Sequence, residues 1–473
     1  MKKILFAASE ALPFAASGGL GDVAGSLPSV IAAEGNDVRV VMPLYSKMSA
    51  EYRESAEFLG YIYVTLGWRR QYCGIFTLEK DGVVYYFIDN EYYFKRDRLY
   101  GEYDDAERFA FFSKAVLDIL PFVDFMPDIL HCNDWQTALS VVYLKKQYGL
   151  VPGYADIKAI FTIHNIQYQG RYGKELLTDL FGLDPKELKT LEYDGDLNLL
   201  KGAIVCADAV TTVSPTYAKE ILSPQFSHGL HHVLEQHKGK LVGILNGIDY
   251  DYYDPSHDDS LFVKYTWRSI ARKAQNKHEL QRMLGLPESD SPLIAVISRL
   301  VDHKGLDLVT LAADDMMADD VQFVVLGTGD PYFESFFSSL ASRYPGKVKC
   351  LLQYNKELSK KIYAASDIFL MPSLSEPCGL SQMIASRYGS VPVIHETGGL
   401  YDSIRDIGWQ GGGNGFTFAP YNAYDMLCSV RRAEELYHDR EAWRKLSQKV
   451  MRVDFTWGKS AKQYIALYDS LCK

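Results

Sequence analysis

The stretch "KKILFAASEALPFAASGGLGDVAGSL", residues 2–27, decides the fold class of this chain. Its apolar run at 2–9 predicts a β-strand, and the following turn places Ser17, Gly18 and Gly19 just before a helical stretch. A glycine turn between a strand and a helix lets the backbone approach a phosphate, because the helix N-terminus then faces the anion. We therefore predict an α/β protein in which this turn is a candidate phosphate-binding loop. An ordinary tight turn is the alternative.

Short apolar runs alternate with longer amphipathic stretches along the whole chain. This pattern predicts two doubly wound parallel sheets whose strands are joined by helical crossovers. The further strands of the first half are expected at 37–43, 128–133, 158–164 and 208–214, with a small meander at 60–66, 73–79 and 83–89. The strands of the second half are expected at 292–300, 321–327, 348–353, 367–373 and 391–395.

The length of 473 residues exceeds the roughly 250–300 at which a single hydrophobic core stops growing, so two domains are expected. The segment "LNGIDYDYYDP" at 245–255 combines an Asn-Gly turn with a polar run that ends in proline, which is typical of a hinge. We place an N-terminal domain at 1–245, a C-terminal domain at 246–455 and a final helical stretch at 456–473. The spacing of that last stretch allows it to pack on either domain.

The composition excludes several classes of protein. Acidic residues outnumber basic ones, 60 to 50, and the net charge of −10 argues against a nucleic-acid partner. Seven widely spread cysteines without a Cys-x-x-Cys pair indicate a reducing compartment. The start mimics a signal peptide, but Glu10 and Pro13 interrupt its apolar run, so we interpret it as a first strand. No run approaches the roughly 18 apolar residues of a membrane span. We expect a cytoplasmic protein without a membrane partner.

The segment "SRLVDHKGLDL" at 298–308 is the sharpest local sign of an anion site. Arg299 ends an apolar strand, and Lys304 stands just before a glycine at the start of a helix. A guanidinium fork and an ammonium suit a diphosphate. Two solvated surface charges are the alternative. Glu376, in "SEPCGLSQM", also follows a strand and could accept hydrogen bonds from sugar hydroxyls, or simply favour a helix N-terminus.

In the first half, "HCNDWQTA" (131–138) and "TIHNIQYQG" (162–170) end two predicted strands with polar groups. Ligands of open α/β sheets gather outside the carboxyl ends of the strands, so Asp134, His164 and Asn165 are placed where a site is expected. A single histidine at a strand end is more often a structural group. Its neighbours favour a polar cleft here.

Other candidate motifs carry less weight. The histidines of "HGLHH" at 228–232 have metal-like spacing, but neither a cysteine nor a carboxylate completes a ligand set. "DGD" at 194–196 resembles an acid pair that holds a metal-bound sugar nucleotide, yet we expect it between helical stretches. P-loop and nucleophile-elbow motifs are absent. The first glycine loop has one residue more than the dinucleotide fingerprint, so that pattern is weak. A nicotinamide-dependent dehydrogenase is disfavoured because the second half brings its own phosphate site. We expect neither a metal nor a cofactor.

A close echo of the first glycine loop, "TGGLYDSI", follows the strand at 391–395 and contains Thr397, Gly398 and Gly399. The first loop follows the first strand of its half, whereas the echo follows the fifth strand of the other half. The two copies therefore do not mark a simple duplication, and each is a candidate phosphate-binding turn in its own domain.

Across almost its whole length the chain resembles the bacterial glycogen/starch synthases. The resemblance rests on "SGGLGDVAGSLP", "HCNDWQTA", "TIHNIQYQG", "ILNGIDYDYYDP", "SRLVDHKGLDL", "SEPCGL" and "TGGLYDS", in the family's order and at similar spacing. It implies a GT-B architecture, with two Rossmann-like domains facing across a cleft and the C-terminal helix crossing back to the first. It also implies transfer of glucose from ADP-glucose to an α-1,4-glucan such as glycogen or starch, with retention of configuration. The choice of ADP over UDP follows from the resemblance alone.

The resemblance further implies roles for residues in the matching motifs. Arg299 and Lys304 are the implied diphosphate clamp and, with His164 and Glu376, form the implied catalytic set. Tyr354, in "LLQYNKE", would pack against the base. The implied donor-binding residues are Ser17, Gly18, Gly19, Asp134, Asn165, Asn246, Tyr354, Cys378, Gly379, Leu380, Thr397, Gly398 and Gly399.

One position departs from the family's pattern. The family usually carries a lysine two residues before the first glycine of the amino-terminal loop, and this chain has Ala16 there. A missing charged hydrogen bond to phosphate would weaken donor binding. The alternative of a catalytically silent glucan-binding paralogue therefore stays open, although Arg299, Lys304, Glu376, His164 and Asn165 are all retained.

Overall fold

A computed structural model describes residues 1–408 and 412–472. The chain forms two compact units, the first made of Met1–Gly247 with Trp457–Lys473 and the second of Ile248–Thr456. The last residue of the predicted C-terminal helix, Lys473, lies outside the described residues. Among the described residues, no helix is long and apolar enough to cross a membrane.

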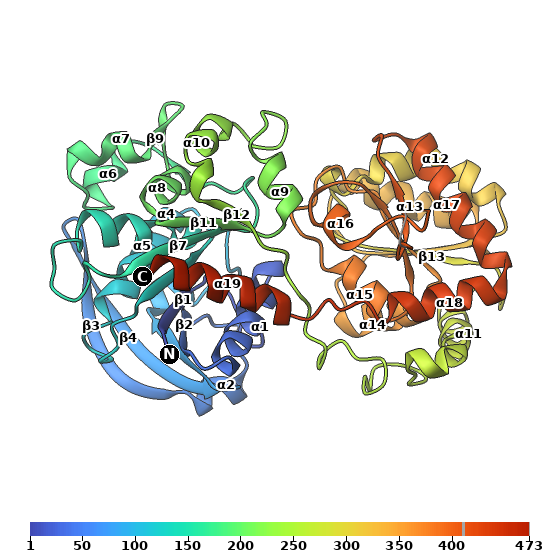
Figure 1. Ribbon diagram of the computed structural model, residues 1–473, viewed down its shortest axis with the longest axis horizontal. Coiled ribbons are helices and arrows are strands. Elements are labelled where there is room, and N and C mark those ends of the chain that lie inside the picture. Colours follow the sequence, from blue (N-terminus) through green and yellow to red (C-terminus); the bar gives the residue numbers. More distant parts are fainter. Residues whose placement is uncertain (409–411, 473) are drawn as a thin grey trace. The chain divides into compact units, whose positions relative to one another are not determined.

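The first unit is built on a nine-stranded sheet in the order β12-β11-β7-β6-β1-β2-β5-β4-β3 (Figure 1). The strands from β12 to β5 are parallel, and β4 and β3 extend the sheet in antiparallel fashion. The predicted meander is therefore part of the main sheet. The strands are β1 (Lys3–Ala7), β2 (Asp37–Pro43), β3 (Glu57–Leu66), β4 (Arg69–Lys80), β5 (Val83–Asp89), β6 (Ile129–Asn133), β7 (Lys158–Ile163), β11 (Ala209–Thr212) and β12 (Leu241–Gly243).

The central strand of this sheet shows why polar groups collect at strand ends. Ile4, Leu5 and Phe6 of β1 are completely buried, because helices cover both faces of the parallel part of the sheet. The helices of this unit are α1 (Gly19–Ala33), α2 (Ala50–Ser55), α3 (Glu91–Phe94), α4 (Asp105–Asp118), α5 (Trp135–Lys146), α6 (Leu176–Asp179), α7 (Leu188–Leu191), α8 (Leu199–Cys206), α9 (Pro215–Glu220), α10 (His231–Gln236) and α19 (Gly458–Leu471).

The C-terminal helix α19 packs within the first unit, where Figure 1 shows it in red beside α1. The buried hydroxyl of Tyr468 lies 2.8 Å from Nδ1 of His131 on β6, and the ring of Tyr464 packs against the same imidazole. The other ring nitrogen of His131 lies 2.6 Å from the Thr162 hydroxyl on β7. A histidine in the predicted motif "HCNDWQTA" thus has a structural role beneath α19.

The second unit contains a six-stranded parallel sheet in the order β15-β14-β13-β16-β17-β18. Its strands are β13 (Leu293–Ile297), β14 (Gln322–Leu326), β15 (Val348–Leu351), β16 (Ile368–Met371), β17 (Val391–His395) and β18 (Phe416–Phe418). Its helices are α11 (Lys273–Leu284), α12 (Leu306–Ala318), α13 (Pro331–Arg343), α14 (Lys356–Ala365), α15 (Ser381–Arg387), α16 (Gly398–Ser403), α17 (Ala423–His438) and α18 (Arg440–Val450). All five predicted strands of this half are confirmed.

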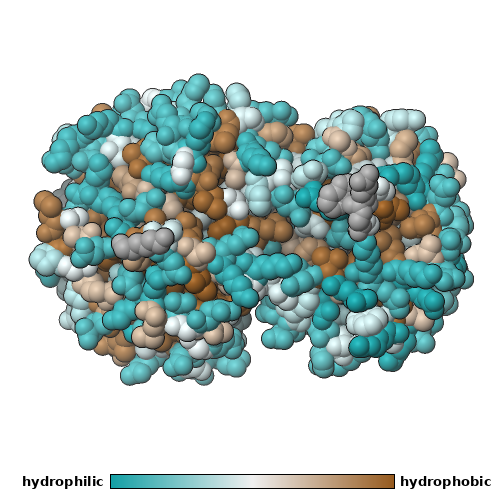
Figure 2. Space-filling model, in the orientation of Figure 1, coloured by the Kyte–Doolittle hydropathy of each residue, from teal (hydrophilic) through white to brown (hydrophobic). Residues whose placement is uncertain are grey.

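Some elements were missed or misplaced by the sequence analysis. The short strands β12 and β18 were not predicted. A three-stranded sheet, β8 (Arg171–Tyr172), β10 (Asp196–Asn198) and β9 (Glu192–Tyr193), was not predicted either. "DGD" lies between the helices α7 and α8, as predicted, but inside a hairpin: Asp194 and Gly195 connect β9 to β10, and Asp196 begins β10. Asp194 and Asp196 both pair with Arg171. On the face shown in Figure 2, hydrophilic residues cover much of each unit, with hydrophobic residues interspersed.

Candidate active site

In the first unit, the predicted polar residues meet at the carboxyl ends of β6 and β7. Asp134 follows β6 with a left-handed backbone (φ 56°), and its Oδ1 accepts a 2.7 Å hydrogen bond from the backbone N–H of His164. The imidazole Nε2 of His164 lies 2.9 Å from Oδ1 of Asn133, whose amide nitrogen donates to the carbonyl of Ala7 on β1. Three neighbouring strands therefore fix the orientation of His164.

Burial sets the protonation of this group. It lowers the pKa of His164 to about 3, so the imidazole is neutral near pH 7. Burial raises the pKa of Asp134 to about 7, although the backbone N–H groups of His164 and Asn165 stabilise its carboxylate. The group therefore offers a neutral imidazole and a carboxyl that titrates near neutrality, which suits hydrogen bonding to hydroxyl groups.

The first glycine loop is organised by Glu10, whose role the sequence analysis missed. One carboxylate oxygen accepts from the Ser17 backbone (2.8 Å) and hydroxyl (2.6 Å), and the other accepts from the backbone of Gly18 (3.2 Å) and Gly21 (3.0 Å). These N–H groups are thus directed at an internal carboxylate. The loop therefore does bind an anion, but this anion is the carboxylate of Glu10.

Glu10 also links the glycine loop to the His164 group. Its side chain is buried, which raises its carboxyl pKa, and the negative charge of Glu10 contributes to the raised pKa of Asp134. The phenol of Tyr100, which is half-buried, interacts with Glu10 and lies 2.8 Å from the Ser9 hydroxyl. The carboxyl ends of β1, β6 and β7 therefore share one polar neighbourhood.

Asn246 lies in the same unit, just after β12. Its side chain is buried, and its Oδ1 has no hydrogen-bond partner among the described residues. A buried amide oxygen without a partner is costly, because desolvation is not repaid by a hydrogen bond. An external donor such as a sugar hydroxyl would satisfy it.

In the second unit, the carboxyl ends of β13 and β16 bring two predicted residues together. The ammonium of Lys304 lies 2.6 Å from Oε2 of Glu376, and the hydroxyl of Ser373 donates to the same oxygen at 3.1 Å. Both charged side chains are largely buried. The second oxygen, Oε1, accepts no hydrogen bond from a described residue, so it keeps its capacity to accept one.

The second glycine loop packs directly on the segment that carries Glu376. The Gly399 N–H donates to the Glu376 carbonyl at 3.1 Å. A Cβ on Gly398, where φ is +44°, would lie 2.0 Å from that carbonyl oxygen, and one on Gly399 would lie 2.2 Å from the Cys378 carbonyl oxygen. Only glycine allows this approach, so these two residues shape the loop around Glu376.

The remaining predicted residues of this unit occupy the same sheet edge at different distances from the ion pair. Gly379 has a left-handed backbone, and its carbonyl and that of Cys378 accept from the Gln382 side chain. Leu380 precedes α15, and Thr397 precedes α16. Tyr354 follows the edge strand β15, which β14 separates from β13, and its side chain is 82% exposed.

Arg299 is exposed and stands beside His303, another residue that the sequence analysis did not single out. Burial, followed by the charge of Lys304, lowers the pKa of His303 to about 4, with a further contribution from Arg299. His303 is therefore neutral, whereas its neighbours Arg299 and Lys304 are cations. The signal for His303 was its place between them in "SRLVDHKGL".

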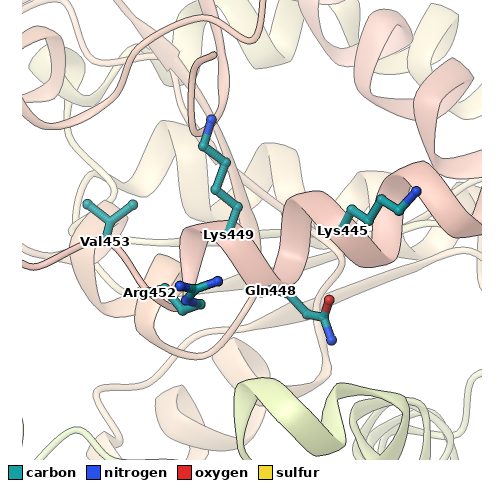
Figure 3. A pocket seen from close by; sticks show the side chains of 5 residues that line it. All are labelled: Lys445, Gln448, Lys449, Arg452 and Val453. Atoms are coloured by element: carbon teal, nitrogen blue, oxygen red, sulfur yellow. The ribbon is translucent and has the colours of Figure 1, made fainter. Parts of the chain in front are cut away.

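Two other features lie apart from these groups. The ring centroids of His231 and His232 lie 4.0 Å apart with the ring planes at 42°, and the described residues contain no cluster suited to a metal ion. An open hollow of about 550 Å³ lies along α18 and contains none of the predicted site residues (Figure 3). It is lined by Lys445, Gln448, Lys449, Arg452 and Val453.

Comparisons with known proteins agree with this organisation. Residues 3–236 match the starch synthase catalytic domain, and residues 279–450 match the glycosyl transferases group 1 domain. The fold also matches the catalytic domain of starch synthase IV from Arabidopsis thaliana bound to ADP and acarbose. The TM-score is 0.92 at 36% identity, over 100% of this chain and 99% of that chain. The chain is thus a glycosyltransferase with the two Rossmann-like domains of the GT-B fold.

The full-length relatives define the family more closely. The chain is 48% identical over 475 residues to a glycogen synthase of Geobacillus thermodenitrificans, covering 100% of this chain and 98% of the relative. It is also 48% identical over 472 residues to a glycogen synthase of Bacillus cereus, covering 99% of each. The chain belongs to the bacterial glycogen synthase family.

Proposed function

We propose that this enzyme transfers glucose from ADP-glucose to the non-reducing end of an α-1,4-glucan, with retention of the anomeric configuration. The observation that carries the proposal is the Lys304–Glu376 pair at the carboxyl ends of β13 and β16. The ammonium of Lys304, which would bind a phosphate, lies next to the carboxylate of Glu376, which would bind a sugar hydroxyl. The substrates named for the relatives, glycogen and starch, and the ADP of the solved structure support the same assignment.

The second unit would bind the nucleotide and its diphosphate. An ammonium has three donors, so Lys304 can bond Glu376 and still reach a phosphate, while Arg299 supplies a guanidinium fork. Glu376 Oε1 would accept a glucosyl hydroxyl. The backbone of Cys378, Gly379 and Leu380 and the loop Thr397–Gly399 would complete the donor site, and the Tyr354 ring would pack on the base.

The first unit would bind the reacting sugar. His164 and Asn165 would flank it, and the carboxyl of Asp134 would bond a glucose hydroxyl. The buried Oδ1 of Asn246 would accept another. Because three N–H groups of the first glycine loop already bond Glu10, Ser17–Gly19 would shape the site more than they bind phosphate.

The chemistry would be a front-face substitution. The bond between the anomeric carbon and the diphosphate breaks, the acceptor hydroxyl bonds the same face, and the leaving phosphate takes the acceptor proton. Arg299 and Lys304 would stabilise the negative charge that grows on the diphosphate. Since protein cations serve this purpose, we expect no metal requirement.

The test is incubation of the purified protein with glycogen and either ADP-glucose or UDP-glucose, measuring nucleotide release with and without a chelator. We expect release of ADP that chelator does not reduce. Glycogen binding without nucleotide release would instead identify a catalytically silent glucan-binding protein. A rate lost to chelator and restored by magnesium would show that charge neutralisation had been assigned to the wrong groups. We also propose that the enzyme works in the cytoplasm, where reduced cysteines are expected.

A further inference from the structure

The outer face of the β3–β4 ribbon exposes an aromatic surface that the proposed reaction does not use. Tyr61 and Tyr63 on β3 and Tyr72 on β4 are 54%, 48% and 37% exposed. The alternate side chains of β3, including Val64 and Leu66, are buried on the opposite face of the sheet. Because side chains alternate across a strand, the three tyrosines share one face, which we call the tyrosine face.

The rings of this face are grouped closely. The ring centroids of Tyr61 and Tyr72 lie 5.5 Å apart with planes at 33°, and those of Tyr61 and Tyr63 lie 5.8 Å apart with planes at 90°. The strand register pairs Tyr63 with Tyr72 and Tyr61 with Gly74. The tyrosines therefore form one continuous aromatic surface across two strands.

Gly74 gives Tyr72 its position. A Cβ on Gly74 would lie 2.7 Å from the Tyr72 hydroxyl and 3.1 Å from Cζ, so the ring lies over the backbone of Gly74. Glycine in the middle of a strand costs about 0.5–1 kcal/mol relative to alanine and commonly marks a close approach. Because Gly74 has no side chain, the Tyr72 ring can pack directly against the backbone of β4.

Polar groups border the tyrosine face. The guanidinium of Arg70 lies 4.2 Å from the centre of the Tyr63 ring. Asp89 on β5 pairs with Gly74. Burial raises the pKa of the Tyr72 hydroxyl, and the negative charge of Asp89 raises it further. The border thus carries charges of both signs beside apolar ring faces, which suits a neutral polyhydroxyl ligand with flat C–H surfaces better than a charged one.

We propose that the tyrosine face binds the α-glucan polymer at a second site, away from the reacting chain end. This inference rests on the proposed function, which makes a glucan the acceptor. β3 is five strands from β6 in the sheet, which at about 4.8 Å per strand is roughly 24 Å. A long glucan could contact both places, whereas a maltotriose acceptor would contact only the catalytic groups.

The alternative occupant, a second copy of this chain, is less well matched to the surface. The register of edge strand β3 shifts between Phe58 and Gly60, and such irregularities discourage pairing with another strand. The three tyrosines and the polar residues around them are also far fewer than the roughly 20–30 residues that each partner contributes to a stable protein–protein interface.

The test compares glycogen binding by the full-length protein without donor, using affinity electrophoresis, for the double variant Tyr61→Ala/Tyr72→Ala and for Gly74→Ala. The second variant keeps all three tyrosines but displaces the Tyr72 ring. The control is Tyr332→Ala, which removes an exposed tyrosine (62%) from α13 in the other unit. We expect the double variant to raise the Kd for glycogen about tenfold, Gly74→Ala to raise it in the same direction and Tyr332→Ala to leave it unchanged.

Kinetics separate this inference from the proposed function. The double variant should raise the KM for glycogen and leave kcat and KM for maltotriose unchanged. If the double variant bound glycogen as tightly as wild type and still transferred glucose, the inference that the tyrosine face binds glucan would be wrong. If the wild type did not transfer glucose but the double variant bound glycogen more weakly than the wild type, the proposed reaction would be wrong and glucan binding by the tyrosine face would be supported. A wild-type dimer that the double variant converts to a monomer in light scattering, with glycogen binding intact, would assign the face to self-association and overturn the inference.

Discussion

The ammonium of Lys304 lies 2.6 Å from the carboxylate of Glu376 and joins two loops that are 72 residues apart in the sequence. The pair is largely buried, with side chains 17% and 9% exposed. Removing one partner of a buried pair leaves the other charge uncompensated, whereas removing both can be nearly neutral. The pair therefore couples the stability of the second unit to the position of the cation proposed to act on the diphosphate.

We expect Lys304→Ala to lower kcat by about 10²-fold, because the variant loses a cation that acts on charge developing as the bond breaks. It should also reduce the free energy of unfolding by about 3 kcal/mol, because Glu376 stays buried without its partner. The double variant Lys304→Ala/Glu376→Ala should be more stable than the sum of the single losses predicts. Steady-state kinetics and urea unfolding measure both effects.

Lys356→Ala removes an exposed lysine from α14 of the same unit and is the matched control. It should leave kcat unchanged, and it should change the free energy of unfolding by no more than a few tenths of a kcal/mol, roughly the range of an exposed position. If Lys304→Ala raised KM alone and left kcat intact, the contact would act on the ground state, and the proposed clamp on the developing charge would be wrong.

The raised pKa of Asp134 makes stability depend on pH. Its carboxyl titrates near pH 7 in the folded protein and near 3.8 when unfolded, so between these values the folded state holds more protons. The free energy of unfolding contributed by Asp134 is therefore highest at acid pH and falls as pH rises through 7. Relative to wild type, Asp134→Asn should gain roughly 2–3 kcal/mol between pH 5 and pH 8.

Urea unfolding at the two pH values checks this expectation, with Asp156→Asn as the control because Asp156 is exposed. A difference between Asp134→Asn and wild type that is the same at both pH values would mean that Asp134 is ionised throughout. The hydrogen bonds from His164 and Asn165 would then outweigh the effect of burial.

The strands and the residues at their carboxyl ends could be predicted because buried parallel strands are apolar until they end. Asp134, His164, Lys304 and Glu376 each stand out at such an end, and the topology of parallel strands brings ends together. Partners supplied from a distant part of the sequence leave no local pattern. The ion pair between Lys304 and Glu376 and the contact of α19 with His131 therefore appeared only in the structure.

The two glycine loops show a different limit. Their shared pattern indicates a turn that leads into a helix, but it does not say which acceptor the N–H groups of the turn meet. In the first loop the acceptor is the Glu10 carboxylate, and in the second the Gly399 N–H meets the Glu376 carbonyl. Glu10 was visible as a charge just after an apolar strand. Its burial against the loop depends on the fold of residues 10–21 and could not be read from spacing.

Glu10→Ala should loosen the first glycine loop, because Gly21 loses the acceptor of its buried N–H group. We expect the free energy of unfolding to fall by about 1–3 kcal/mol and amide exchange at Gly21 to accelerate. Glu10→Gln keeps one acceptor oxygen and should lose less. Glu34→Ala, an exposed position at the end of α1, is the control for removal of a carboxylate. Unchanged exchange at Gly21 in Glu10→Ala would show that the loop is held by its own turn geometry.

Ala16 occupies the position where the family usually carries a lysine, and its surroundings define what that lysine would meet. Ala16 is half-buried, and a Cβ on Gly21 would lie 2.4 Å from its methyl group, so this side chain faces the glycine loop. An ammonium introduced here has two candidate anions, the phosphate of the donor and the carboxylate of Glu10. The two outcomes differ in what they change: one tightens donor binding, and the other stabilises the free protein.

If the phosphate is the partner, Ala16→Lys should tighten ADP-glucose binding by up to about 1.5–3 kcal/mol, and by less if the side chain stays solvated. The gain should shrink in Ala16→Lys/Lys304→Ala if both cations act on one diphosphate, because effects on a shared partner are not additive. Calorimetric titration with ADP-glucose measures it, and Ala33→Lys at the exposed end of α1 controls for the added charge. Unchanged affinity together with a higher midpoint of urea unfolding would identify Glu10 as the partner. The first glycine loop would then shape the site around its own carboxylate, and Arg299 and Lys304 would be the cations left to meet the diphosphate.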